Sequence, residues 1–150
     1  MSQTTLYLDD LHLGQRFVSP HAEITGDQIK AFAREFDPQP FHLDEEAAKD
    51  TFFKGLAASG WHTAALTMRL NVESLPLAGG ILGMGVEVNW SLPVRPGDVL
   101  HVESEVVAIA PTKPDARRGV VVIASRTVNP KGETVQTNRA KLLVSRRPGG

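Results

Sequence analysis

The sequence contains no cysteine among its 150 residues. This absence excludes disulfide bonds, thiolate metal sites and a cysteine nucleophile. An excess of one charge sign is also missing, since 16 Lys and Arg against 17 Asp and Glu give a formal net charge of -1. Because proteins that bind nucleic acid usually gather basic residues on one face, we expect no nucleic-acid partner.

Long apolar runs are absent as well. No window approaches the roughly 18 uncharged apolar residues of a membrane span, and residues 1–10 lack the basic and apolar regions of a signal peptide. A chain of this length, with 41% hydrophobic and 22% charged residues, fits one globular domain. We therefore expect a single soluble domain over residues 1–150, located in the cytoplasm and without a membrane partner.

The first half of the chain is predicted to be helical. Thr25 and Gln28 have the spacing of a capping box, which starts a helix with one apolar face. Pro38 ends that helix, because proline disfavours helical geometry in the residue before it, so Asp37 is expected at the helix exit. A short helical turn is expected over residues 44–49, with Asp44 as its cap.

A longer helix is predicted from Ser59 or Gly60 to about Val72. Its apolar residues leave few polar positions around the helix, which is typical of a helix buried inside a protein. We expect a sheet to wrap around this helix and to account for its burial.

The second half of the chain is predicted to form strands. From residue 83 the period becomes two, with Val86, Val88 and Trp90 on the face that is expected to be buried. Further strands are expected near residues 15–19, 100–109, 119–128 and 134–144. The sequence therefore predicts an α+β fold, in which an antiparallel sheet of about five strands surrounds a central buried helix.

The segment from Asp37 to His42 holds the candidate catalytic pair. Pro38 and Pro40 stiffen the path between a carboxylate and an imidazole, which limits how far their separation can vary. Histidine exchanges protons near neutral pH, and a carboxylate can act as a base or orient a water molecule. Alone, each is more simply explained as structural, a helix end and a packed loop histidine. Together with Gly60 they favour a site for proton transfer.

Gly60 supplies the third feature of this candidate site. Glycine at the start of a buried helix leaves its backbone N–H open to the close approach of a ligand oxygen. Such a donor can polarise a carbonyl group and stabilise the negative charge that develops on its oxygen. The sequence therefore predicts an oxyanion donor at Gly60.

In order and spacing, the segment Ile24–Leu66 resembles the hydratase motif of MaoC-like proteins and R-specific enoyl-CoA hydratases. In that family a helix leads into an Asp-x-Asn-Pro-x-His stretch, then a short helix, then a His-Gly pair that opens the central helix of a hot-dog fold. Asp37, His42 and Gly60 match these positions. The segment Pro93–Asp98 also resembles the family's later Pro-Val-x-x-Gly-Asp sequence, so the similarity extends over most of the chain.

The resemblance implies a hydratase or dehydratase that acts on 2-enoyl or 3-hydroxyacyl thioesters in fatty acid metabolism, without a metal or redox cofactor. Asp37 and His42 would activate the water and deliver a proton to the α-carbon, while the Gly60 N–H would hold the thioester oxygen. Coenzyme A, or the pantetheine arm of a carrier protein, would be the thioester handle. The resemblance also implies a homodimer or a higher homo-oligomer, with the active site at or near the subunit interface.

Several residues near the expected substrate depart from the family pattern. Gln39 stands at the motif's usual Asn, Ser59 at the His before the glycine, and Met68 at a Ser that some family hydratases carry. Trp61 and His62 replace smaller or aliphatic residues, and packing in the core is the simpler explanation of both. The residues expected to contact substrate are Gln39, Pro40, Ser59, Trp61 and His62.

Two other functions stay open from the sequence. A hot-dog thioesterase would use a carboxylate on the central helix, but that helix offers no acid before Glu73. A noncatalytic module that binds or assembles acyl thioesters would keep the fold and lose the chemistry.

Arg95 is either a turn residue or a contact for a coenzyme A phosphate. No metal site is expected, because no ligand-like spacing joins His12, His21 and His101.

Overall fold

The computed structural model describes residues 4–149 of the chain. Its strands are β1 (Arg16–Val18), β2 (Ala22–Glu23), β3 (Gly83–Trp90), β4 (Val99–Ile109), β5 (Arg118–Val128) and β6 (Thr134–Ser145). They form one antiparallel sheet in the order β1-β4-β5-β6-β3, with β2 paired to the start of β4. The predicted α+β arrangement is confirmed, with one strand more than the five expected.

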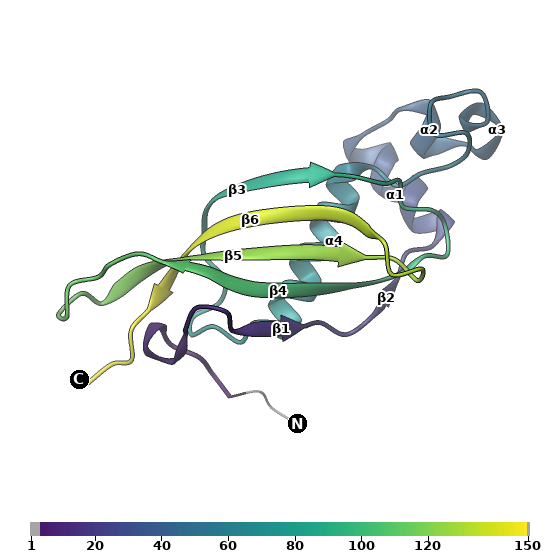
Figure 1. The fold of residues 1–150 in the computed structure, drawn as a ribbon. Coiled ribbons are helices and arrows are strands. Elements are labelled where there is room, and N and C mark those ends of the chain that lie inside the picture. The colour runs from purple at the N-terminus through teal and green to yellow at the C-terminus, as the bar shows by residue number, and fades with distance from the viewer. Residues whose placement is uncertain (1–3, 150) are drawn as a thin grey trace.

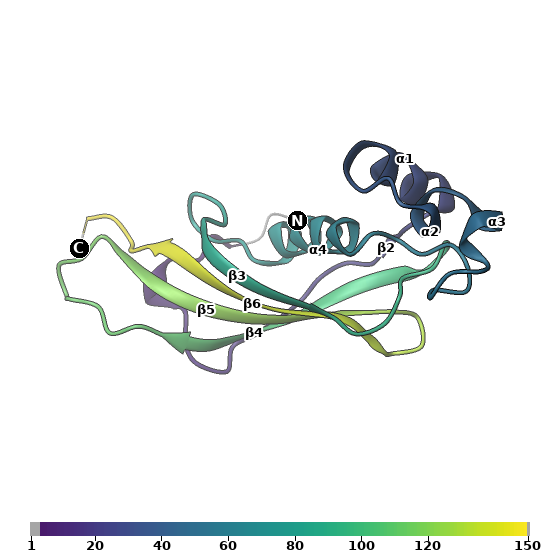
Figure 2. The ribbon, with the colours of Figure 1, turned by 90° about the horizontal axis from the view of Figure 1, so that it is seen from above.

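The helices are the 3-10 turn η1 (Leu8–Asp10), α1 (Gly26–Phe36), α2 (Pro40–Leu43), α3 (Glu45–Ala48) and α4 (Gly60–Ser74). Figures 1 and 2 show α4 lying across one face of the sheet, while α1, α2 and α3 gather together at one end of it. Within residues 4–149, every helix falls short of the length or apolar character that crossing a membrane requires.

Helix α1 begins with the predicted capping box. The Thr25 hydroxyl accepts the Gln28 amide at 3.1 Å, and the Gln28 side chain accepts the Thr25 amide at 2.9 Å. Ile29, on the apolar face of the helix, is fully buried in the core. The helix ends before Pro38, and Asp37 is its C-cap, so the sequence correctly predicts where this carboxylate leaves the helix.

Helix α2, which carries His42, is not predicted from the sequence. Pro40 occupies its first position, where proline fits because that amide needs no partner within the helix. Asp44 then caps α3 as predicted, since its carboxylate accepts the Ala47 amide at 2.9 Å. His42 is therefore held on a helical turn, and the path from Asp37 is ordered along its whole length.

Helix α4 begins where predicted, but the sheet covers only one face of it. Of its apolar residues, Trp61, Met68 and Val72 are 61%, 45% and 53% exposed. The side toward the sheet is partly polar, with Thr67 hydrogen-bonded to Thr127 of β5 at 2.6 Å. The helix is thus half covered rather than enclosed, because Leu70 and the polar residues face the sheet while other apolar residues of the helix have no cover in one chain.

Strand β3 differs from its prediction in the same way. The alternating residues Val86 and Trp90, expected on a buried face, are 62% and 44% exposed. The strand lies at the edge of the sheet and pairs only with β6, so its inner face extends beyond the cover that α4 provides. An apolar edge strand of this kind is a surface on which another chain can pair.

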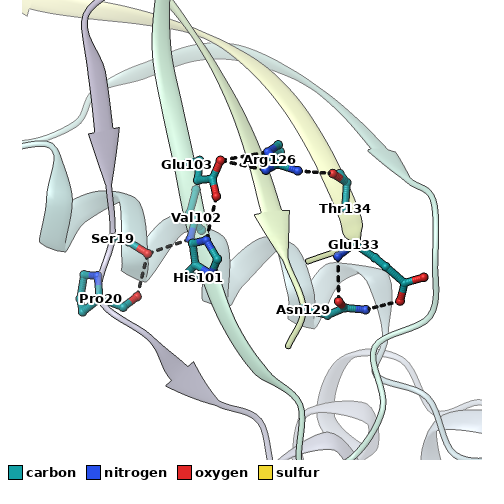
Figure 3. Close-up of polar contacts among 9 residues, drawn as sticks. All are labelled: Ser19, Pro20, His101, Val102, Glu103, Arg126, Asn129, Glu133 and Thr134. Atoms are coloured by element: carbon teal, nitrogen blue, oxygen red, sulfur yellow. Dashed lines mark hydrogen bonds and ion pairs between the residues drawn. The ribbon is translucent and has the colours of Figure 1, made fainter. Parts of the chain in front are cut away.

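Ser19 marks the interruption that separates β1 from β2. Its hydroxyl accepts the Val102 amide of β4 at 2.8 Å and donates to the Pro20 carbonyl at 2.7 Å, as Figure 3 shows. A side chain thus supplies the partner for β4 where the neighbouring strand breaks, and β2 becomes a separate strand. On β4 and β5 the outer side chains Glu103 and Arg126 pair at 2.9 Å, which ties the two neighbouring strands together (Figure 3).

Candidate active site

The structure brings Asp37, His42 and Ser59 together from three helices. Asp37 caps the C-terminus of α1, His42 lies on α2, and Ser59 is the N-cap of α4. The Ser59 hydroxyl donates to Asp37 Oδ2 at 2.7 Å, and His42 Nε2 lies 3.4 Å from the same oxygen. The predicted pair is therefore adjacent in space, and one carboxylate oxygen lies between a hydroxyl and an imidazole.

The orientation of the His42 ring is set by a main-chain carbonyl. His42 is only 4% exposed, and its Nδ1 lies 2.6 Å from the carbonyl oxygen of Ala57. A carbonyl oxygen can only accept a hydrogen bond, so Nδ1 carries a hydrogen and donates a hydrogen bond to the Ala57 carbonyl. In the neutral imidazole this leaves the lone pair on Nε2, the nitrogen that faces Asp37. The ring can therefore accept a proton on the side of the carboxylate.

The Asp37 carboxylate is kept ionised by its hydrogen bonds. Burial of the carboxyl group raises its pKa. The hydrogen bonds from Ser59 and Gln39, together with the charge interaction with His42, lower the pKa by more than burial raises it, so the pKa of Asp37 lies below its ordinary value. The Gln39 amide donates to Asp37 Oδ1 at 2.5 Å, which occupies the second oxygen. The site thus presents an anionic carboxylate 3.4 Å from Nε2 of His42.

The start of α4 leaves one backbone donor free. Ser59 Oγ accepts the Trp61 amide at 3.2 Å, while the Ser59 carbonyl accepts the amides of His62 and Thr63 at 3.0 and 3.1 Å. The amide of Gly60 hydrogen-bonds to no acceptor within residues 4–149. It lies at the positive end of a 15-residue helix, next in the chain to the side chain that holds Asp37. This is the geometry expected of an oxyanion donor.

Gly60 has a second reason to be glycine. A Cβ at this position would lie 2.7 Å from Cε2 and 2.9 Å from Cδ2 of the Trp90 indole. The indole is itself fixed, because its Nε1 donates to Gln136 Oε1 at 2.9 Å. Packing of the first turn of α4 against β3 therefore requires a residue without a side chain.

The residues predicted to contact substrate lie in different surroundings. Ser59 is fully buried, and Gln39, although exposed, directs its amide to Asp37. Pro40 is exposed at the start of α2. Trp61 is exposed and meets Trp90 in a T-shaped contact, with the ring centroids 5.2 Å apart. These positions favour a supporting role for Ser59 and Gln39, and they leave Pro40 and Trp61 accessible to a ligand.

His62 packs against α1. Its ring stacks on Phe32 with the centroids 4.6 Å apart and the planes 7° from parallel. Burial lowers the pKa of His62, and its Nδ1 is buried with no hydrogen-bond partner in residues 4–149. The neutral ring therefore serves as a packing surface between α1 and α4, in agreement with the simpler of the two explanations that the sequence allows.

Arg95 is a residue whose part in the site the sequence does not reveal. Its guanidinium donates to the carbonyl oxygens of Phe53 at 2.5 Å, Gly55 at 3.1 Å and Leu56 at 3.2 Å. The three carbonyls belong to the loop that leads to Ala57, the residue that orients His42. The side chain therefore holds this loop in place. Of the two roles that the sequence left open, a turn residue or a contact for a coenzyme A phosphate, these hydrogen bonds favour a structural role.

Replacing Arg95 by Leu should loosen the loop before α4. Hydrogen bonds from charged groups contribute about 1.5–3 kcal/mol each, so we expect the free energy of unfolding in urea to fall by about 3 kcal/mol. Activity should fall with it, because the Ala57 carbonyl no longer holds its position. The control is Arg95→Lys, which keeps the charge but lacks the planar fork and should recover only part of the stability. An unchanged urea midpoint in Arg95→Leu would contradict this role.

Replacing Ser59 by Ala should shift the pH dependence of activity. The variant loses a hydrogen bond that lowers the pKa of Asp37, so this pKa rises and the acidic limb of the kcat/KM profile moves to higher pH. Ser59→Thr keeps the hydroxyl and should keep the wild-type limb. Lost capping of α4 alone would lower stability without moving the limb, so the profile separates the two effects.

A cavity of about 500 Å³ lies beside this site. It begins at Trp61, the residue after Gly60, and follows α4 toward Leu75 between the helix and strands β3, β5 and β6. Its walls are mainly apolar side chains and glycine, which suits a hydrocarbon chain.

Comparison with known proteins finds a matching family model and several similar proteins. Residues 11–129 match the model of the MaoC like domain. The MaoC-like dehydratase of Rhodospirillum rubrum, known from a crystal structure, is 57% identical, with a TM-score of 0.93 over 96% of this chain and 99% of that chain. The uncharacterized protein YdeM of Bacillus subtilis is 33% identical over 142 residues, which is 93% of this chain and 99% of that protein.

A further relative has a named activity. The 3-hydroxybutyryl-CoA dehydratase of Methylorubrum extorquens is 30% identical over 150 residues, or 97% of this chain and 94% of that protein. The chain therefore belongs to the MaoC-like domain family, and its sheet with one helix across it is the hot-dog fold of the hydratases in that family.

Proposed function

We propose that this protein catalyses the reversible addition of water to 2-enoyl thioesters, with Asp37 and His42 as the acid and base. The observation that carries the proposal is the position of Asp37 Oδ2, 2.7 Å from the Ser59 hydroxyl and 3.4 Å from His42 Nε2. The free amide of Gly60 adjoins this group, so proton acceptors and an oxyanion donor occur together.

The reaction follows from these groups. A water molecule donates its hydrogens to Asp37 and to His42 Nε2, and its oxygen bonds to the β-carbon as one proton passes to the protein. The electron pair of the double bond moves toward the thioester, and the Gly60 N–H stabilises the charge on the carbonyl oxygen. The protein then returns a proton to the α-carbon, and the reverse order of steps removes water.

The thioester handle is proposed to be coenzyme A. The relative from Methylorubrum extorquens is named for a coenzyme A thioester, and the apolar cavity beside Gly60 suits the acyl part of such a substrate. Thioester hydrolysis is less well supported, because Glu73 is the one acid on α4 and its carboxylate pairs with Arg69 at 3.4 Å.

The direct test is loss of the conjugated enoyl-thioester absorbance of crotonyl-CoA and longer 2-enoyl-CoAs on addition of the purified protein. We expect an absorbance decrease together with formation of the 3-hydroxyacyl product, detected by mass spectrometry. Release of free coenzyme A thiol would indicate a thioesterase instead. Binding of the thioesters without any turnover would support the noncatalytic module.

We also propose that the protein is a homodimer joined through β3 and α4. The unpaired edge of β3 carries Met84 and Val86, which are 57% and 62% exposed, and α4 adds the exposed Met68 and Val72. A second copy pairing along β3 would bury these side chains and extend the sheet. The active site at the start of α4 would then lie near the interface.

Light scattering on the eluting protein tests the dimer. We expect twice the mass of one chain, and Val86→Glu should shift the protein toward the monomer because it places a charge in the contact. Val18→Glu is the matched control, since Val18 is 66% exposed on β1 at the opposite edge of the sheet and should not affect the mass. A wild-type protein of monomer mass would exclude this assembly.

A further inference from the structure

A polar row crosses the core between the sheet and α4. Ser104, Ser125 and Asn138 are register partners on β4, β5 and β6, and they are only 4%, 5% and 8% exposed. Asn71 of α4 contacts the β4 end of this row, with its Oδ1 accepting the Ser104 hydroxyl at 3.2 Å. Buried polar side chains are unfavourable without partners, so such a row needs a structural or functional reason.

Internal hydrogen bonds account for most of the row. Ser104 and Ser125 are joined at 2.9 Å, and Ser104 also donates to Asn71. Asn138 is the exception, because its Oδ1 is buried and has no hydrogen-bond partner in residues 4–149. An acceptor held in this way is available to a donor that comes from a ligand.

Asn138 lines the cavity that begins beside Gly60. Ser125 of β5 and Asn71 of α4 also line it, and so do the apolar Met84 and Val86 of β3, the strand that pairs with β6. With a rise of about 1.5 Å per residue, Asn71 lies about 16 Å along α4 from Gly60. A chain that starts with its thioester at Gly60 must therefore be of medium length to reach Asn71, and Asn138 lies on the sheet side of the same cavity.

Charge narrows the chemistry of the group that would bind there. None of the cavity-lining residues is Lys, Arg, His, Asp or Glu, so a carboxylate or an amine on the acyl chain would be buried without a counter-charge. A hydroxyl group is neutral and can donate to Asn138 Oδ1 while it accepts from a side-chain amide.

We propose that the preferred substrates are medium-length 2-enoyl thioesters whose acyl chain carries a hydroxyl group near its far end, bound by Asn138. This inference rests on the proposed hydration reaction and names its substrate class. Asn138 itself is buried within one chain, whereas Met68, Met84 and Val86 of the same cavity belong to the proposed dimer contact.

The test compares ω-hydroxy-trans-2-decenoyl-CoA with trans-2-decenoyl-CoA, and uses crotonyl-CoA as a chain too short to reach Asn138. Wild-type kcat/KM should be about tenfold or more higher for the hydroxylated chain. Asn138→Leu should remove that preference and leave crotonyl-CoA turnover within about twofold of wild type. Thr137→Val, on the next and exposed position of β6, should keep the preference.

The outcomes separate this inference from the proposed reaction. Turnover of crotonyl-CoA with equal kcat/KM for the two decenoyl thioesters overturns the inference and leaves the hydratase intact, even if Asn138→Leu does not fold. An Asn138→Leu variant that keeps the wild-type preference also overturns it. No turnover of any thioester contradicts the proposed reaction, and calorimetric affinities for the two decenoyl thioesters then decide whether the cavity selects the hydroxyl.

Discussion

Asp37→Asn should lower kcat for enoyl-CoA hydration by about 10³-fold or more, in the range typical of a lost acid or base. An amide cannot accept the proton from water, and it removes the negative charge beside His42. The fold should survive, because the amide oxygen can still accept from Ser59, and Gln39 can turn its own side chain to accept from the new NH₂ group.

The measurement is kcat at saturating substrate, with the urea midpoint as a check on folding. Asp44→Asn is the matched control, since Asp44 also accepts hydrogen bonds at a helix terminus but lies outside the site, and Asn caps helices as well as Asp. Its activity should stay within about twofold of wild type. If Asp37→Asn kept a tenth or more of the wild-type kcat, Asp37 would not be the proton acceptor.

Gly60→Ala should destabilise the protein and also reduce its activity. The new Cβ meets the Trp90 indole at 2.7 Å, a distance that requires the ring or the helix to move. Overpacking of this kind costs about 1–3 kcal/mol. Helix propensity alone would favour alanine by up to about 1 kcal/mol, so the sign of the stability change decides which effect dominates. Movement of the Gly60 amide away from the carbonyl oxygen should lower kcat by about 10²-fold.

A second substitution makes the cause of this effect measurable. Trp90→Leu removes the indole, so the methyl group that Gly60→Ala introduces no longer meets it in the double variant. Adding Gly60→Ala to Trp90→Leu should therefore cost little further stability. Urea unfolding of the four proteins forms a double-mutant cycle with a large coupling energy. Additive losses would show that the contact with Trp90 is not what requires glycine.

The local parts of the fold follow from the sequence because their causes are local. The capping box of Thr25 and Gln28, the Asp37 exit before Pro38, and the start of α4 depend on residues within a few positions. Helix α2 escaped the prediction because its four residues are too few to show a helical period.

The supporting contacts of the site could not be predicted in the same way. The Ser59–Asp37 bond joins residues 22 positions apart, and Arg95 reaches carbonyls 39 to 42 positions away. These contacts depend on how α1, α4 and the turn before β4 pack, which no local pattern encodes. Their signal in the sequence is only a buried serine and an arginine in a turn.

The exposed residues of α4 and β3 show a different limit. The alternation of Val86 and Trp90 predicts a strand with one buried face, yet both side chains are substantially exposed in one chain. A hydrophobic pattern records burial in the functional state of a protein, whichever chain provides the cover. The period identified the element correctly, and the missing cover is what motivates the proposed dimer.

In the proposed reaction, the contact between Ser59 and Asp37 would also constrain which double bonds can react. Ser59 holds Asp37 through its side chain, and its carbonyl carbon is bonded to the amide nitrogen of Gly60. The proposed base and the proposed oxyanion donor are therefore held at a fixed separation. This separation would set the distance between the hydrated carbon of the substrate and its thioester carbonyl oxygen. In the proposed reaction, a double bond conjugated to the thioester would place its β-carbon at the water, so the separation that Ser59 maintains would favour 2-enoyl thioesters whatever the length of the acyl chain.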